Sequence, residues 1–165
     1  VNKVTPTLFS LCPTPVEMLA LGQSKLAAII KTIGLAPAKS KNIINTSKII
    51  LEKHKGQVPG TREELENLPG VGRKTANVVL NEGFDLPTIA VDTHVFRVAN
   101  RTGLAQGKNV LATELKLLEV TPEKWLKNAH HYLILHGRYT CTAKSFDCQK
   151  CVIKKECGFT EKINA

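Results

Sequence analysis

The stretch that decides the fold is LPGVGRKTAN, at residues 68–77. It separates two segments of helical periodicity, and its glycines, Gly70 and Gly72, allow backbone conformations with positive φ that other residues resist. Such a turn leaves backbone N–H groups free at the start of the next helix, where they can bind a phosphate oxygen. The small Ala76 permits close helix packing. The stretch predicts a helix-hairpin-helix, a module that binds the DNA backbone without reading sequence, with a plain helix-helix turn as the alternative.

Helical periodicity dominates on both sides of this stretch. Apolar residues recur with a period near 3.6, capping residues and glycines punctuate them, and no convincing period-two alternation is present. The sequence therefore predicts an all-α protein, with helices near 15–22, 24–34, 39–55, 73–81, 93–101, 109–119 and 123–136 and another opening after Thr61. A linker at 85–88, broken by Pro87, predicts two domains, 1–86 and 87–165.

The charge balance points to a polyanionic partner. The 165 residues include 23 Lys and Arg against 14 Asp and Glu, which gives a net charge of +9. An excess of this size favours nucleic acid, although a merely soluble basic protein is the alternative. No run of about 18 apolar residues occurs, and the first residues lack the apolar core of a secretory signal, so we expect no membrane segment.

Lys74 stands in the first turn of the helix that follows the hairpin. The helix dipole disfavours a cation there, so a lysine kept at this position, beside Arg73 and with partial burial, is a candidate nucleophile. The alternative is an exposed lysine that binds phosphate. Eighteen residues further on, Asp92 precedes the next helix and is either an ordinary N-cap or a carboxylate that assists an amine nucleophile.

Four of the five cysteines fall within 17 consecutive positions, in the pattern C-x6-C-x2-C-x5-C. Zinc sites usually contain two close pairs, whereas only Cys148 and Cys151 are close here, so the spacing favours an iron–sulfur cluster, with zinc as the alternative. The candidate ligands are Cys141, Cys148, Cys151 and Cys157. Lysines in and after this loop suggest that it also presents charge to DNA.

The remaining chemically interesting side chains favour structural roles. A metal site among His130, His131 and His136 is conceivable, but packing or hydrogen bonding is the favoured interpretation. Trp125 and Tyr132 are too sparse for a base-stacking platform and are expected in the core.

Residues 68–77, the segment VDTHVFR at 91–97, the segment HGR at 136–138 and the four-cysteine loop occur in one order. In this combination the chain resembles the endonuclease III family. The resemblance implies an all-helical DNA glycosylase and AP lyase of base excision repair, which removes oxidised pyrimidines and cleaves the abasic strand by β-elimination. It implies a monomer in the bacterial cytoplasm, associated with the nucleoid, whose partner is double-stranded DNA with damaged pyrimidines or abasic sites.

The resemblance also assigns roles to residues at matching positions. Lys74 corresponds to the nucleophile that attacks the sugar C1′ atom and forms a Schiff base, Asp92 to the carboxylate that assists it, and the four cysteines to the [4Fe–4S] ligands. Leu35 corresponds to the apolar wedge that holds the opened duplex. The other expected DNA contacts are Gly70, Val71, Gly72, Arg73 and Lys144.

The chain departs from the family pattern in three places. Family members usually have further helical sequence before the point that matches Val1, so we expect an N-terminally shortened domain. Ala36 replaces the aromatic residue often found after Leu35, and Asp147 accompanies Lys144 in the cysteine loop. Alternative functions are an adenine glycosylase of A/G mispairs, against which Lys74 argues, and a non-catalytic DNA-binding fragment.

Overall fold

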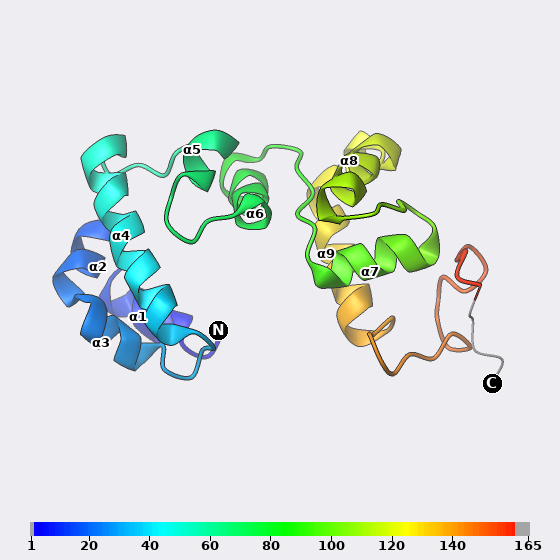
Figure 1. The fold of residues 1–165 in the computed structure, drawn as a ribbon, viewed down its shortest axis with the longest axis horizontal. Helices are drawn as coiled ribbons and strands as arrows, with labels where there is room; N and C mark the ends of the chain where they lie inside the picture. The colour runs from blue at the N-terminus through cyan, green and yellow to red at the C-terminus, as the bar shows by residue number, and fades with distance from the viewer. Residues whose placement is uncertain (1, 161–165) are drawn as a thin grey trace. The chain divides into compact units, whose positions relative to one another are not determined.

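The structure is a computed structural model that describes residues 2–160, so the last residues of the expected second domain, 161–165, lie outside the described part. Figure 1 shows helices joined by loops. They are α1 Thr5–Leu11, α2 Pro15–Leu21, α3 Gln23–Ile29, α4 Ala36–His54, α5 Arg62–Glu66, α6 Arg73–Phe84, α7 Thr93–Thr102, α8 Val110–Val120 and α9 Glu123–Tyr139. Strand-type pairing within residues 2–160 is limited to one bridge between Cys141 and Phe146, which confirms the all-α prediction.

The chain forms two compact units, which divide between Gly72 and Arg73. The linker at 85–88 predicts a later domain boundary, after residue 86. The difference arises because α6 is bound to the segment that follows it: Asn81 on α6 donates a hydrogen bond to the Thr88 carbonyl, and Thr88 donates one back to the Asn77 carbonyl. Helix α6 therefore belongs to the second compact unit, and the division of function between domains at residue 86 stays a prediction.

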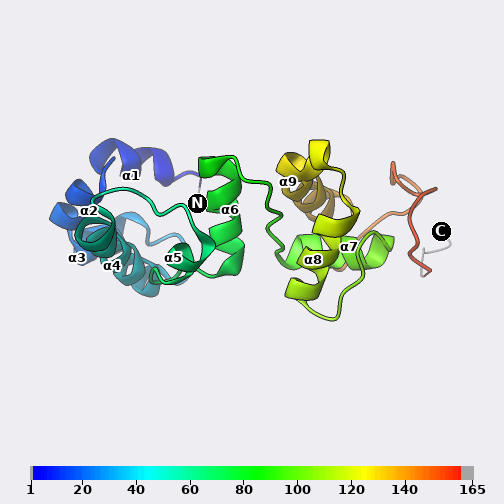
Figure 2. The same ribbon diagram turned by 90° about the horizontal axis from the view of Figure 1, so that it is seen from above.

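In the first unit, α2 and α3 pack against α4 (Figure 2). Their apolar faces, together with α1, enclose the first core. It comprises Leu8, Cys12, Met18, Leu26, Ile30 and Ala36. Cys12, the one cysteine outside the four-cysteine loop, is 3% exposed inside this cluster.

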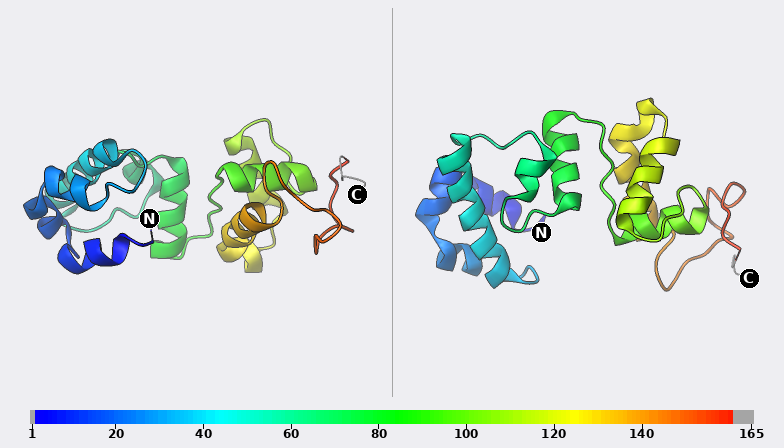
Figure 3. Two further views of the ribbon diagram at one scale, coloured as in Figure 1. Left: turned by 90° about the horizontal axis from the view of Figure 1, so that it is seen from below. Right: turned by 45° about the horizontal axis from the view of Figure 1, so that its top comes forward.

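In the second unit, α7 packs against both α8 and α9. Its core gathers residues from these helices, from the segment before α7 and from the loop between α7 and α8. The members are Ile89, Val91, Val95, Ala99, Ala105, Leu117 and Ala129. After α9 the chain runs on as an irregular loop that carries the four cysteines (Figure 3). No helix within residues 2–160 is both long enough and apolar enough to span a membrane.

Several helix boundaries follow the predicted capping chemistry. Thr14 and Glu17 form a capping box at the start of the helix predicted near 15–22, Gly22 ends α2, and the Thr61 hydroxyl accepts from the Glu64 amide. The prediction for the next helix was wrong in detail: α3 begins after Gly22 rather than at Ser24, and it ends at Ile29, before Gly34. Helix α1 was missed, although Pro6 lies in its first turn, where proline is favoured.

The aromatic residues of α9 also differ from expectation. Trp125 and Tyr132 are 48% and 54% exposed, so their assignment to the core is wrong. Their rings meet edge to face with centroids 6.3 Å apart. The second-unit core is filled instead by aliphatic side chains and by the partly buried Phe96.

Candidate functional site

The hairpin at residues 68–72 is anchored to α4. The Val71 amide donates to the Leu68 carbonyl at 3.0 Å, which closes the turn. The Thr46 hydroxyl on α4 donates to the Pro69 carbonyl, also at 3.0 Å. Leu68 is buried and Val71 is half-buried. The turn is thus held on its protein side by local and long-range hydrogen bonds.

The two glycines of the hairpin serve different purposes. Gly70 has φ +78°, and a Cβ atom there would lie 2.5 Å from the Asn42 amide nitrogen and 3.0 Å from the Asn42 Cβ. Gly72 has no such φ, is exposed, and a Cβ there would meet nothing within 4 Å. Gly70 is therefore required by the fold, whereas Gly72 keeps the solvent side of the turn small.

Leu35 lies in the first unit on the turn before α4. Its side chain is 77% exposed, and its backbone is left-handed with φ 63°. The Lys39 ammonium donates to the Gly34 carbonyl at 2.6 Å and so ties the turn to α4. An exposed apolar side chain on a strained backbone is a feature that folding alone does not favour.

Lys74 and Asp92 lie at the beginnings of two helices of the second unit. Lys74 is in the first turn of α6 and is exposed, so the partial burial expected from the sequence is wrong. Asp92 is the N-cap of α7, and its Oδ1 atom accepts from the His94 and Val95 amides at 2.8 and 2.9 Å. Both hydrogen bonds of the N-cap end on Oδ1, so Oδ2 takes no part in capping α7.

The pKa of His130 on α9 is affected by the charges of both Lys74 and Asp92. Its Nδ1 atom lies 2.6 Å from the Ala90 carbonyl oxygen, which confirms the hydrogen-bonding interpretation of this histidine. Burial lowers the pKa of His130; the hydrogen bond to Ala90 opposes this shift, the charge of Lys74 adds to it, and the charge of Asp92 opposes it. Lys74 and Asp92 are thus both near enough to act on the same imidazole.

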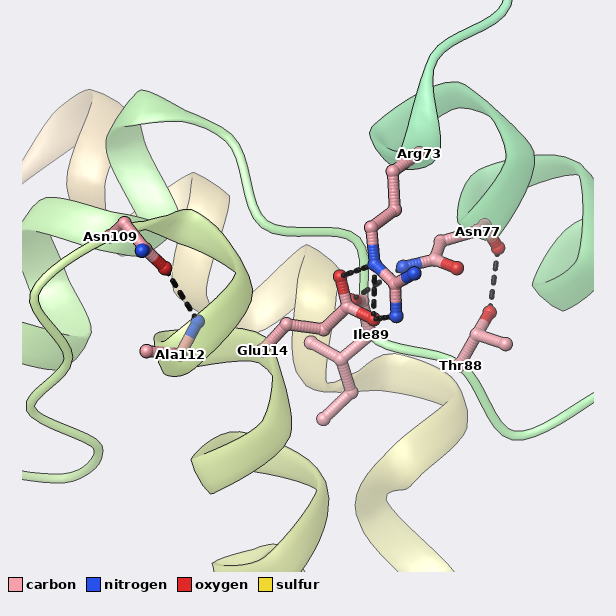
Figure 4. Close-up of polar contacts among 7 residues, drawn as sticks. All are labelled: Arg73, Asn77, Thr88, Ile89, Asn109, Ala112 and Glu114. Atoms are coloured by element: carbon pink, nitrogen blue, oxygen red, sulfur yellow. Dashed lines mark hydrogen bonds and ion pairs between the residues drawn. The ribbon is translucent and has the colours of Figure 1, made fainter. Parts of the chain in front are cut away.

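Arg73, the neighbour of Lys74, is bound to a carboxylate from α8. Its Nε atom donates to both oxygens of Glu114, at 3.1 and 2.9 Å, and its Nη2 atom donates to Oε1 at 2.8 Å. Figure 4 shows the two side chains pointing toward one another. The Glu114 side chain is 2% exposed and that of Arg73 is 36% exposed. The pair fixes the first turn of α6 to α8 and compensates the cation beside Lys74.

The four cysteines of the loop line one small cavity. Cys141, Cys148, Cys151 and Cys157 all face it. All five cysteines of the chain are described, and none forms a disulfide. Within residues 2–160 no three His, Cys, Asp or Glu side chains converge closely enough to hold a single metal ion.

Arg101 on α7 organises this loop. It donates to the Thr142 carbonyl at 2.6 Å and to the Cys141 Sγ atom at 3.6 Å. Its guanidinium lies 4.4 Å from the centre of the Phe146 ring and 5.3 Å from that of the Phe159 ring. On the loop surface Lys144 is exposed, and Asp147 accepts from the amides of Gln149 and Lys150.

Sequence reasoning missed four residues that shape this region: Asn77, Asn81, Arg101 and Glu114. The partners of Arg73 and Arg101 are about 40 residues away along the chain, which no local pattern reveals. Glu114 carried one usable signal, since it is a carboxylate within the largely apolar run VLATELKLLEV. Asn77 and Asn81 are separated by one helical turn, and such spacing on a buried face indicates a polar contact with a neighbouring segment.

Comparison with known proteins places this architecture in a family. Residues 1–123 match the model described as the HhH-GPD superfamily base excision DNA repair protein. Endonuclease III of Escherichia coli strain K12 is 55% identical over 99% of this chain and 78% of its own length. Endonuclease III of Haemophilus influenzae is 55% identical over 99% of this chain and 77% of its own length.

Solved structures agree with these relatives. A trapped endonuclease III–DNA covalent intermediate matches with a TM-score of 0.89 and 42% identity, over 95% of this chain and 74% of that one. A thermostable thymine-DNA glycosylase matches with a TM-score of 0.87 and 25% identity, over 98% of this chain and 76% of that one. These relatives define the class, a helix-hairpin-helix DNA glycosylase of base excision repair. Within that class the chain belongs to the endonuclease III family, whose members are DNA glycosylases and AP lyases.

The different surroundings of the hairpin glycines give a matched pair of variants. Gly70→Ala is expected to lower the free energy of unfolding by about 1–3 kcal/mol, because alanine resists positive φ and its Cβ meets Asn42. Gly72→Ala should change it by less than about 0.5 kcal/mol. Urea unfolding measures both. Equal losses in the two variants would contradict the assignment of Gly70 to the fold.

The buried carboxylate gives a second prediction. Glu114→Gln is expected to cost about 1–3 kcal/mol of stability, below the range for a fully buried pair because the Arg73 side chain is 36% exposed. The double variant Arg73→Met with Glu114→Leu should recover much of that loss, since it leaves neither charge behind. Thermal unfolding of the wild type, Glu114→Gln and the double variant tests this prediction. A double variant less stable than Glu114→Gln would contradict it.

Proposed function

We propose that this chain excises oxidised pyrimidines from double-stranded DNA, acting as a monomer on the bacterial nucleoid, and cleaves the resulting abasic strand through a Schiff base on Lys74. The observation that carries the proposal is the placement of an exposed lysine, Lys74, in the first turn of α6 and of a carboxylate, Asp92, at the N-cap of α7. The trapped covalent intermediate of an endonuclease III with DNA supports a covalent step in this family. The net charge of +9 supports a DNA partner.

The Lys74 amine supplies the nucleophile. Its exposure lets a flipped-out nucleotide reach the Nζ atom, which attacks the sugar C1′ as the bond to the base breaks. The proton lost from the amine goes to the Asp92 carboxylate, whose Oδ2 atom takes no part in the helix cap. The base leaves as an anion that takes up a proton from water. The C1′–O4′ bond then breaks, O4′ takes up the proton held by Asp92, and C1′ and Nζ form the iminium. Loss of a C2′ proton from the iminium to water forms the C2′–C3′ double bond as the C3′–O bond breaks and releases the 3′ phosphate.

The surrounding DNA contacts follow from the geometry of the hairpin and of Leu35. Gly70, Val71 and Gly72 offer a turn whose solvent side is small enough for close approach of a phosphate. Leu35 offers an exposed apolar wedge that replaces stacking around the gap in the duplex. Lys144 adds an exposed charge on the cysteine loop, whereas Arg73, bound to Glu114, contributes to DNA binding mainly by fixing α6.

We further propose that Cys141, Cys148, Cys151 and Cys157 hold a [4Fe–4S] cluster. The four thiols line one cavity, and their C-x6-C-x2-C-x5-C spacing contains one close pair, whereas zinc sites usually contain two. When bound, the cluster cross-links the loop. The Arg101 hydrogen bond to Cys141 supports the charge of the thiolates.

The Schiff base is tested by borohydride trapping on DNA that contains an abasic site. The wild-type chain is expected to give a covalent adduct, and Lys74→Ala is expected to give none, because the nucleophile is removed. Lys116→Ala, which removes an exposed lysine from α8, is the matched control and should trap like the wild type. Trapping by Lys74→Ala at the wild-type level would show that another amine reacts. No adduct from the wild type would leave only DNA binding.

The cluster is tested by metal analysis of protein purified without oxygen. We expect about four iron atoms per chain and visible absorbance. Cys148→Ser should lose most of the iron, whereas Cys12→Ala, which changes a buried cysteine in the first unit, should keep it. A colourless protein with one zinc per chain would overturn the cluster assignment.

A further inference from the structure

An extended segment joins the two ends of the candidate catalytic site. It begins after α6 at Asp85 and ends at Asp92, and we refer to residues 85–92 as the strap. The strap has no strand partner in the described part of the chain. Its central residues Ile89, Ala90 and Val91 are at most 2% exposed. Their buried backbone groups therefore need partners other than a sheet, since an unpaired buried carbonyl costs about 1–3 kcal/mol.

Side chains supply those partners on three consecutive carbonyls. Asn81 donates to the Thr88 carbonyl at 2.9 Å, and Asn77 donates to the Ile89 carbonyl at 3.3 Å. The Ala90 carbonyl lies 2.6 Å from His130 Nδ1. The Thr88 hydroxyl completes the set by donating to the Asn77 carbonyl at 2.6 Å. Figure 4 shows Asn77 beside Thr88 and Ile89.

The donors come from α6, which carries Lys74, and from α9. Asn77 and Asn81 are one turn apart on α6, and Lys74 lies almost one turn before Asn77 on the same helix. The helix that carries the nucleophile therefore also holds the strap that ends at the carboxylate. The third donor, His130, fixes the carbonyl two residues before Asp92.

The protonation state of His130 suits this role. A carbonyl oxygen only accepts hydrogen bonds, so Nδ1 must carry the proton. Burial lowers the pKa of His130, which keeps the imidazole neutral near pH 7. The charged groups that act on it are Lys74, Asp92 and the neighbouring His131. A neutral ring can donate to the Ala90 carbonyl without adding a second positive charge to that of Lys74.

We propose that Asn77, Asn81 and His130 are positioning residues that hold the strap so that Asp92 stays in place to assist Lys74. This inference rests on the proposed roles of those two residues. The three residues act through the strap and do not touch the reacting atoms. Because His130 is only partly buried and donates a single bond, it is the position at which the idea can be tested with least damage to the core.

The test compares variants at two adjacent histidines. His130→Leu removes the donor, and His130→Asn keeps one, because an asparagine amide nitrogen lies at about the position of Nδ1. His131→Leu is the matched control. His131 is exposed, its ion pair with Glu82 is long at 3.8 Å, and the bond to the Ala90 carbonyl comes from His130. The readouts are the single-turnover rate of borohydride trapping at saturating enzyme, the Kd for the same DNA and the Tm.

We expect His130→Leu to slow trapping roughly tenfold to a hundredfold, as misplaced catalytic groups do, with Kd within about twofold of the wild type. His130→Asn should restore most of the rate, and His131→Leu should match the wild type. Should His130→Leu unfold, His130→Gln takes its place, because its amide reaches the position of Nε2 rather than Nδ1. Wild-type trapping by a folded donorless variant, or an equal loss in His130→Asn, overturns the inference.

A second readout separates this inference from the proposed chemistry. Hydrogen exchange at the His94 and Val95 amides, which bind Asp92, should accelerate in His130→Leu and return toward the wild-type rate in His130→Asn. If the wild-type chain fails to trap DNA but these exchange rates change as expected, the proposed function fails and the positioning role stands. Unchanged exchange in His130→Leu counts against the positioning role whatever the trapping assay shows.

Discussion

A buried loop segment that pairs with no sheet must satisfy its buried carbonyls by other means, and that constraint shapes the second unit of this protein. The strap is bound from α6 by two asparagines and from α9 by a histidine. Because those helices also carry or surround the residues proposed for catalysis, the same bonds that prevent an energetic penalty also define where the carboxylate stands. Stability and geometry are supplied together, which explains why so many buried polar groups occur within a short stretch.

The positive charges around Lys74 are also limited by neighbouring groups. The Arg73 cation is compensated by a carboxylate that is almost completely buried, and burial lowers the pKa of His130, which favours its neutral form. Both arrangements limit the positive charge that accumulates near the amine before DNA arrives. The negative group that remains, Asp92, is held by two backbone amides through one of its oxygens. Few uncompensated charges therefore surround the Lys74 amine when DNA binds.

The sequence was sufficient for features governed by local chemistry. The helix near 15–22, the Asp92 cap and the helices around the hairpin depend on neighbouring residues, and the structure confirms them. It was insufficient where partners are remote. The carboxylate for Arg73 lies 41 residues away, and the strap bonds of Asn77 depend on how the chain returns after α6. The exposure of Trp125 was missed because periodicity shows which residues share a helix face without showing whether anything covers it.

The close approach of α4 to the hairpin has a consequence for how this chain can diverge. The Asn42 side chain occupies the space that any side chain at position 70 would need. Even the Cβ atom of Asn42 lies 3.0 Å from the point where a Cβ atom of residue 70 would lie. Positions 42 and 70 are therefore not free to vary independently. Shortening residue 42 would remove the contact with its amide group but leave the contact with its Cβ atom and the positive φ at 70, so substitution is more restricted at 70 than at 42. Substitution patterns at these two sites should be asymmetric.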